Sequence, residues 1–264
     1  MKTRTIFLLL ITFSFSFKNV EAQAAPNKTD ANGKKQGHWI KLDANHKKIY
    51  DGNFLDGTPI GTFTYYYDNG IQKAVSTFSD NGKVCYTKIY DAGGNISGKG
   101  KYVNEKRDSI WTFYNTDGKV ISDELYVNGA KNGICHVFYD NGQLAEEKMW
   151  KDGKPNGMVK KYFMSGQLKY NGTMVMDKVE GKITFYYPSG VLQAEGMYKE
   201  DVKDGDWKYY EEDGKIKRID KFIMGRQMNA KDDYIKKEDE QKAREQSEQL
   251  EIKDPTQDGY QPPH

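Results

Sequence analysis

One 24-residue stretch, GICHVFYDNGQLAEEKMWKDGKPN at residues 133–156, sets the pattern for most of the chain. Steps of 24 residues in both directions reach further copies with no insertion or deletion. The eight copies begin at Gly37, Gly61, Cys85, Ser109, Gly133, Gly157, Gly181 and Gly205. A fixed period of this length is typical of repeat architectures, in which each copy is one small structural unit. We therefore predict a single repeat domain over residues 37–228.

Each copy carries two strand patterns and two turn patterns. Apolar and polar residues alternate soon after the first position, as in Ile110 to Tyr114, and this period of two predicts a strand. Nine residues after the start, seven of the eight copies carry a glycine, which supplies the positive φ of a tight hairpin turn. These turn glycines are Gly70, Gly94, Gly118, Gly142, Gly166, Gly190 and Gly214.

Two strands and two turns in 24 residues leave no room for a helix, so the copies predict an all-β fold. About sixteen strands would form one open, twisted, antiparallel meander, roughly 75 Å long at about 4.8 Å per strand. No copy can bury its own aromatic residues, so we expect neighbouring copies to stack column on column. One such column, two residues after each start, is Trp39, Phe63, Thr87, Trp111, Cys135, Val159, Ile183 and Trp207.

The third copy departs furthest from the pattern. Cys85 replaces the first glycine, and Thr87 replaces the large apolar residue of the column just described. We expect a local bulge or bend in the sheet there. Cys85 and Cys135 lie two copies apart, which places them roughly 19 Å from each other, too far for a disulfide between them.

The two ends of the chain differ from the repeats. Residues 1–22 combine a basic start, an apolar run of twelve residues and a small-residue cleavage site, which predicts a signal peptide and an exported protein, periplasmic or extracellular. Residues 23–36 are small and polar, and we expect a flexible lead-in. Residues 229–252 are highly charged, which favours a short solvent-exposed helix, and 253–264 read as a disordered tail.

The chain carries no recognisable catalytic or metal-binding motif. The histidines of the repeats, His38, His46 and His136, fall in the first and fifth copies, too far apart to share a metal ion. The acidic run from Asp201 to Asp206 lacks the alternating spacing of a calcium loop. The net charge is only +2, and no basic patch suggests nucleic acid. We therefore expect no enzyme activity, no cofactor and no metal.

A column of aromatic residues lies five residues after the start of the copies, on the face opposite Trp111. It contains Tyr66, Tyr90, Tyr114, Phe138, Tyr162, Tyr186 and Tyr210, which we call the tyrosine ladder. One interpretation is a stacked structural ladder. The alternative is a binding surface for a polymer or an extended peptide, because contiguous aromatic surface often marks an interaction site.

The repeat resembles a known family. The resemblance rests on Tyr126-Val-Asn-Gly129, Gly133, Phe138-Tyr139-Asp-Asn-Gly142 and Leu144, and again on Trp150-Lys-Asp-Gly153, Gly157, Tyr162-Phe163, Gly166 and Leu168. These residues are similar to the MORN (membrane occupation and recognition nexus) repeat, in the bacterial variant of antitoxin-like proteins. Repeats of this family serve as scaffolds and adaptors, as appendages of lipid kinases and lysine methyltransferases, and in some members at membranes.

Together these features favour an exported, non-catalytic repeat protein that acts as a scaffold or adaptor for another protein. Two alternatives stay open from the sequence. The chain could be a carbohydrate- or membrane-surface-binding module, or an antitoxin-like protein that binds and neutralises a partner.

Overall fold

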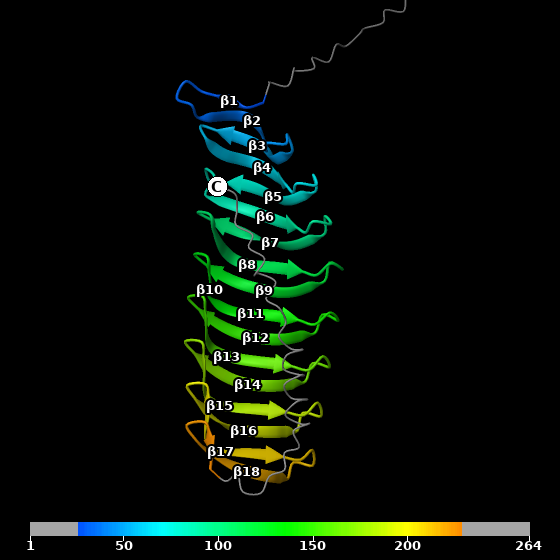
Figure 1. Cartoon of the computed structure of the whole chain (residues 1–264), viewed down its shortest axis with the longest axis vertical. Coiled ribbons are helices and arrows are strands. Elements are labelled where there is room, and N and C mark those ends of the chain that lie inside the picture. The colour runs from blue at the N-terminus through cyan, green and yellow to red at the C-terminus, as the bar shows by residue number, and fades with distance from the viewer. Residues whose placement is uncertain (1–25, 229–264) are drawn as a thin grey trace, which may run out of the picture.

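The computed structural model describes residues 26–228, which form one antiparallel β-sheet with no helix among them. The strands lie across the long axis of the molecule, and the chain advances along that axis from β1 to β18 (Figure 1). Each strand pairs with the next along the chain, apart from short β10, beside which β9 pairs directly with β11. The predicted all-β, open, elongated meander is confirmed.

The sheet has nineteen strands, three of which have only two residues. The first nine are β1 (Lys28–Thr29), β2 (Lys35–Leu42), β3 (Lys48–Leu55), β4 (Thr58–Tyr66), β5 (Gln72–Ser79), β6 (Val84–Tyr90), β7 (Ile96–Val103), β8 (Lys106–Tyr114) and β9 (Val120–Val127). The others are β10 (Ala130–Lys131), β11 (Gly133–Phe138), β12 (Leu144–Lys151), β13 (Lys154–Tyr162), β14 (Leu168–Val175), β15 (Lys178–Tyr186), β16 (Leu192–Lys199), β17 (Val202–Tyr210), β18 (Ile216–Ile223) and β19 (Arg226–Gln227).

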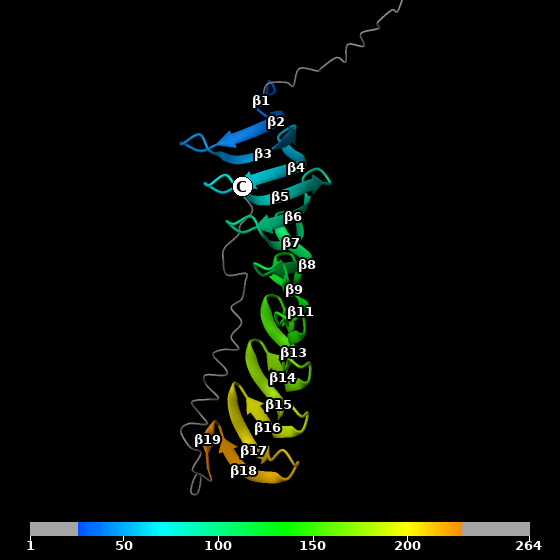
Figure 2. The same ribbon diagram turned by 90° about the vertical axis from the view of Figure 1, so that its right-hand side faces the viewer.

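The sheet twists along its length. In the view turned by 90°, the strands near β3 run across the picture, whereas those near β8 and β9 are seen almost end-on (Figure 2). This rotation follows from the right-handed twist of each strand. Two faces result: the aromatic face, which carries Trp111 and Trp207, and the opposite ladder face, which carries the tyrosine ladder.

On the aromatic face, large side chains lie directly over glycines of the preceding strand. Trp111 has no exposed surface, and a Cβ atom added to Gly100 would lie 2.2 Å from its ring. The same relation, at 2.3 to 2.4 Å, joins three more pairs eleven residues apart: Gly52 with Phe63, Gly172 with Ile183, and Gly196 with Trp207. Where the earlier residue is larger, as at Ser76, the later one is small, here Thr87. The two residues of each such pair therefore fill one limited space, in which only one of them can be large.

A bulge bends the first strand of most copies. In the pairing of β3 with β4, Asp51 faces Thr64 and Asn53 faces Ile60. An advance of two residues along β3 therefore corresponds to an advance of four residues along β4. Gly61, at φ 62°, lies within the bulge, where glycine reaches a positive φ without steric cost. Ser109 takes the same conformation, with φ 61°, in the fourth copy.

The expected bend at the third copy is wrong. Strands β5 and β6 pair residue for residue from Ala74 with Ile89 to Ser79 with Val84, with no register shift. The bulge needs a positive φ at the first position, and Cys85 does not adopt one. The extra length lies instead in the preceding turn, where Asp80, Asn81 and Gly82 all have positive φ.

The predicted flexible lead-in at 23–36 is also wrong for its described part, which forms a hairpin. Lys28 pairs with Gln36, and Thr29 pairs with Lys35. The Asp30 carboxylate closes the turn by accepting hydrogen bonds from two backbone amides, those of Asn32 and Lys34. The predicted signal peptide (1–22), charged helix (229–252) and tail (253–264) lie outside the described residues.

We predict that Gly100→Ala lowers the free energy of unfolding by about 1–3 kcal/mol, because the new methyl group overlaps the Trp111 ring. In a Trp111→Val background the same substitution should cost almost nothing, since the ring is gone. Thermal and urea melts of the four proteins measure this double-mutant cycle. Equal losses in both backgrounds would contradict the contact.

Candidate functional site

The tyrosine ladder lies along one margin of the ladder face. Each of its seven residues is the last residue of its strand, next to a hairpin turn, and each is half-buried. Successive members are two strands apart, roughly 10 Å, which is too far for ring stacking. No ring contact joins two ladder residues within residues 26–228, and the role of the ladder, structural or binding, stays a prediction.

The ladder rings contact charged side chains instead of each other. The Tyr210 hydroxyl donates a hydrogen bond of 2.9 Å to Glu195, and that of Tyr162 donates one of 3.3 Å to Glu147. The ammonium group of Lys48 lies over the ring of Tyr66, at 5.6 Å from its centroid. These contacts restrain the side chains of Tyr66, Tyr162 and Tyr210.

The turns beside the ladder link each copy to the next. The hydroxyl groups of Tyr67, Tyr139 and Tyr187 donate hydrogen bonds of 2.7–2.8 Å to the backbone carbonyls of the ladder residues Tyr90, Tyr162 and Tyr210. The seven turn glycines have φ between 75° and 91°, the region that tight turns require. Sequence analysis did not predict these three hydrogen bonds, although the donor and the acceptor are 23 residues apart in each of them.

An apolar surface runs along the middle of the ladder face, with four of its side chains exposed and those of Leu125 and Met158 half-buried. It consists of Tyr86, Ile110, Leu125, Ile134, Met149 and Met158, which we call the apolar stripe. Ile110 pairs with Leu125, and Ile134 pairs with Met149, so the side chains are neighbours across strands. Tyr86 is 60% exposed and Ile110 61% exposed. Sequence analysis did not identify this surface, because its residues stand at two different positions of the repeat, one and sixteen residues after the start. Only the pairing of the strands shows that these positions are neighbours.

Polar and charged groups border the apolar stripe. On one side Asp123 and His136 are joined at 2.7 Å, beside a hollow of about 740 Å³ that Ile110 and Phe138 also line. At its N-terminal end Lys88 lies directly opposite Lys99, a like-charge pair that is unfavourable without an anion nearby. Neither lysine forms an ion pair among the described residues.

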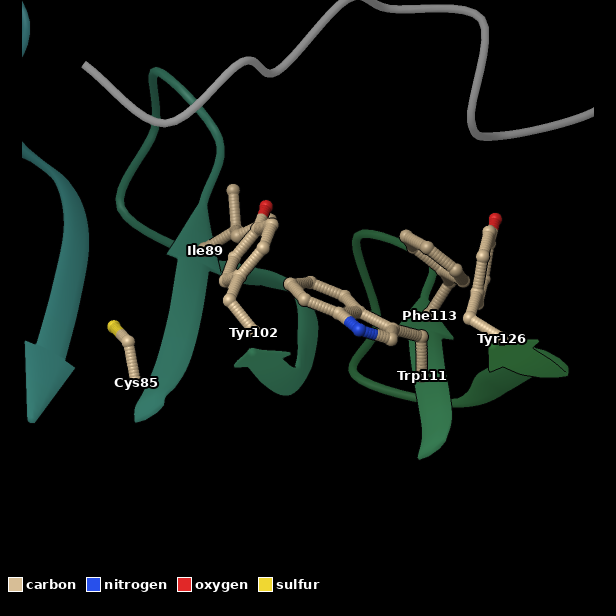
Figure 3. Packing of buried hydrophobic residues seen from close by; sticks show 6 residues of the cluster. All are labelled: Cys85, Ile89, Tyr102, Trp111, Phe113 and Tyr126. Atoms are coloured by element: carbon tan, nitrogen blue, oxygen red, sulfur yellow. The ribbon is translucent and has the colours of Figure 1, made fainter. Parts of the chain in front are cut away.

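A second candidate site is a cavity of about 640 Å³ on the aromatic face, which we call the third-copy cavity. Its lining runs from Lys35 to Glu105 and includes the buried Ser76, Cys85 and Thr87, which we call its floor; the Thr87 hydroxyl lies 2.9 Å from the Ser76 hydroxyl and 3.2 Å from the Cys85 sulfur. The rings of Phe78 and Tyr102 are among its walls. In Figure 3, Tyr102 lies against Trp111, whereas Cys85 stands apart from all the rings.

Cations cover the tryptophans of the aromatic face. Lys35, Arg107 and Lys203 each precede a tryptophan by four residues and lie over its ring, at 4.9, 4.8 and 4.3 Å from the centroids of Trp39, Trp111 and Trp207. Burial lowers the pKa of Arg107, but the hydroxyls of Tyr126 and Tyr102 outweigh it and raise the pKa above its ordinary value. The aromatic face is therefore shielded by charged side chains rather than by a second layer.

Both cysteines are free thiols buried in the aromatic face. Burial raises the pKa of each thiol above its ordinary value, which makes both slow to react. Among residues 26–228 no group of three or more His, Cys, Asp or Glu side chains could hold a metal ion. In the same part of the chain, no helix has the length and apolar character needed to cross a membrane.

The family model described as a MORN repeat variant matches residues 107–128, 131–152, 179–200 and 203–223. The chain belongs to the MORN-repeat family. The matched segments of this MORN-repeat protein each contain the hairpin built from two neighbouring strands of the meander. The same 24-residue spacing extends to the copies that the family model leaves unmatched.

No curated protein matches the chain. Two solved structures show a partial likeness: a crystal structure of TarM, with 15% identity and a TM-score of 0.27, and one of a mutant S. aureus TarM in complex with Fondaparinux, alpha-GlcNAc-glycerol and UDP, with 14% identity and a TM-score of 0.28. The alignments cover 35% and 36% of this chain, and 20% and 19% of those chains. The chain spans about a fifth of their length, and TM-scores this low carry no weight for its fold or function.

The ladder carboxylate Glu195 gives a pH-dependent prediction. Hydrogen bonds from Lys182 and Tyr210 lower the pKa of Glu195 below its ordinary value of 4.5. Its stabilising contribution is therefore present above pH 4.5 and is lost as the pH falls through the folded-state pKa. We expect Glu195→Gln to lower the melting temperature by a few degrees at pH 7, at most about 1 kcal/mol, and this difference should shrink as the pH falls below 4.5. A pH-independent difference between the two proteins would refute this account.

Proposed function

We propose that this MORN-repeat protein is an exported, non-catalytic scaffold that binds another protein through the apolar stripe of its ladder face. MORN repeats favour a role in protein or membrane binding. The proposal rests above all on the exposure of Tyr86 and Ile110, at 60% and 61% of their surface. Large apolar side chains that gather in one exposed patch mark an interaction site more often than single exposed residues do.

The apolar stripe is confined to the central copies. At the position of Ile110, the second copy has Thr62, the seventh Lys182 and the eighth Asp206. The fold itself therefore does not need an apolar residue there. The change from polar to apolar in the third to sixth copies supports selection for contact with a partner.

The surroundings of the stripe favour a protein over a glycan or a membrane. A glycan platform needs freely exposed rings, whereas the ladder rings are half-buried and contact Lys48, Glu147 and Glu195. A membrane surface would favour cations alone beside the stripe, but Asp123 lies there with His136. We expect a partner surface with apolar residues and with acidic residues facing Lys88 and Lys99, because an apolar centre with a charged rim is typical of protein interfaces.

Export and the lack of catalysis are further parts of the proposal. Export is supported by residues 1–22, whose pattern predicts a signal peptide. The non-catalytic role is supported by the use of MORN repeats as binding modules and by a sequence without a recognisable catalytic motif. Cell fractionation and N-terminal sequencing test the first part, with a mature chain beginning near Gln23 as the expected result.

The stripe is tested with a paired set of variants. We expect the double variant Ile110→Asp, Ile134→Asp to lose at least about tenfold in affinity for the partner, because charges would enter the centre of the interface. Thr62→Asp is the matched control, since it adds a charge at the same position of the second copy. The measurement is stoichiometric co-purification from the native envelope and medium, followed by binding to the isolated partner.

Melting curves of the three proteins check that the exposed substitutions leave the sheet intact. If the partner bound the double variant and the wild type equally, the stripe would not be its binding site. If no protein were retained, while glycan or liposome sedimentation retained the chain, the scaffold proposal would fail in favour of those alternatives.

A further inference from the structure

We propose that the third-copy cavity binds a small planar aromatic molecule, whose ring takes the place that Phe63 and Trp111 fill in the neighbouring copies. This site lies on the aromatic face, opposite the apolar stripe, and does not depend on the proposed scaffold function. Three observations carry it: a position without a ring between two copies that carry one, a cation without a ring beneath it, and a cavity of suitable size.

Thr87 lies between two copies, the second and the fourth, that carry a ring at this position of the aromatic face. On one side, Phe63 contacts Phe78 edge to face, with 5.2 Å between ring centroids. On the other side, Trp111 contacts Tyr102 in the same manner, at 4.8 Å. Thr87, at the equivalent position between them, has no aromatic ring.

The gap between the two flanking rings is suited to one further ring. Phe78 pairs with Cys85, and Cys85 pairs with Tyr102, so the two rings lie on strands separated by one strand only. Strands at this separation are roughly 10 Å apart. An aromatic ring prefers an edge-to-face or offset contact at about 4.5–7 Å between centroids, so a ring placed between them would contact both.

Lys83, near the end of the second copy, is the cation next to Thr87. It occupies the position at which Lys35, Arg107 and Lys203 cover their tryptophans, four residues before the ring column. Its backbone carbonyl accepts a hydrogen bond from the amide of Asn104, just as that of Arg107 accepts one from the amide of Gly129.

The surroundings of Lys83 nevertheless differ from those of its counterparts. Lys83 lines the cavity and is exposed, and within residues 26–228 it has neither an ion pair nor a ring contact. A bound aromatic ring would supply the missing cation–π partner.

The cavity has the size and lining of a small-molecule site. Its volume of about 640 Å³ lies within the range of roughly 300–1,000 Å³ typical of such sites. The polar groups of its floor, on Ser76, Cys85 and Thr87, lie within hydrogen-bond distance of one another. An apolar ring can therefore cover the floor without leaving these groups unsatisfied.

The fifth copy shows how the chain compensates for a small residue with its own side chains. Cys135 is as small as Thr87, but Lys131 lies 2.9 Å from Glu124 and covers the Trp150 ring at 4.8 Å from its centroid. Around Thr87 of the third copy, Tyr102 stands at the position of Trp150, but Ser76 stands at that of Glu124, so Lys83 forms no such ion pair among the described residues. The third copy is thus the one that an external ring would complete.

Indole is the probe for the test, with cyclohexanol as an apolar ring that lacks a π face. We expect indole to bind the mature wild-type chain, measured by calorimetry and ligand-detected NMR, and to bind at least tenfold more tightly than cyclohexanol. The double variant Ser76→Gly, Thr87→Trp copies the Gly100 and Trp111 pair, so it should fill the cavity and weaken indole binding at least tenfold. Lys83→Gln should weaken binding about two- to fivefold.

Thiol labelling supplies a second readout that does not need the filled variant to fold. Cys85 lines the cavity, whereas Cys135 is equally buried two copies away. Saturating indole should slow the labelling of Cys85 and leave that of Cys135 unchanged. The Ile110→Asp, Ile134→Asp variant should bind indole as the wild type does, which separates this site from the apolar stripe.

Several results would overturn the proposal. They are an absence of indole binding, equal binding by the folded Ser76→Gly, Thr87→Trp variant, binding of cyclohexanol as tight as that of indole, or an unchanged labelling rate of Cys85 in saturating indole.

Discussion

The contact between a large side chain and the glycine eleven residues before it is the constraint on which the sheet depends. Because Gly100 has no side chain, the Trp111 ring lies flat against the backbone of the neighbouring strand, and the ring becomes completely buried. Gly196 and Trp207 repeat the arrangement near the C-terminal end. The described sheet has no helix layer, so a core of this kind has to form within the sheet and its own side chains.

The cations of the aromatic face complete this core. Arg107 lies over Trp111 and donates a hydrogen bond of 3.1 Å to the Tyr126 hydroxyl, which in turn donates one of 2.6 Å to Glu124. The alkyl part of such a side chain covers apolar surface while its charged end stays hydrogen-bonded. A chain in which 30% of residues are charged can therefore bury its tryptophans, because part of that charge lies over the rings.

Much of this fold could be predicted from the sequence, because period and turn chemistry are local. Asp-Asn-Gly142 indicates a tight turn without knowledge of the rest of the chain, and the alternation around Trp111 places the ladder on the other face. The bulges could not be predicted, since Gly61 and Ser109 adopt the same positive φ although only one of them is glycine. Cys85 does not adopt a positive φ at the same position. The bulge is therefore absent between β5 and β6, and the preceding turn is longer.

The candidate sites depend on relations between columns, which appear only when the register is known. Ile110 and Leu125 are fifteen residues apart, and their contact in the apolar stripe follows from a cross-strand pair. The third-copy cavity likewise arises from the combination of Ser76 with Thr87, not from either residue alone. The sequence marked the third copy as unusual but could not show that its irregularity opens a cavity instead of a bend.

Repeat architecture explains why one copy can differ so much without loss of the fold. Stability in such proteins is approximately a sum over copies and their nearest neighbours, so a weak contact at Thr87 affects only the adjacent copies. The strand β6 illustrates the result: Cys85 and Thr87 line the cavity, while Tyr86 between them belongs to the apolar stripe on the opposite face. Copies that satisfy their own contacts form the frame of the sheet, and both of our proposed binding sites include residues of the copy whose side chains leave a contact incomplete.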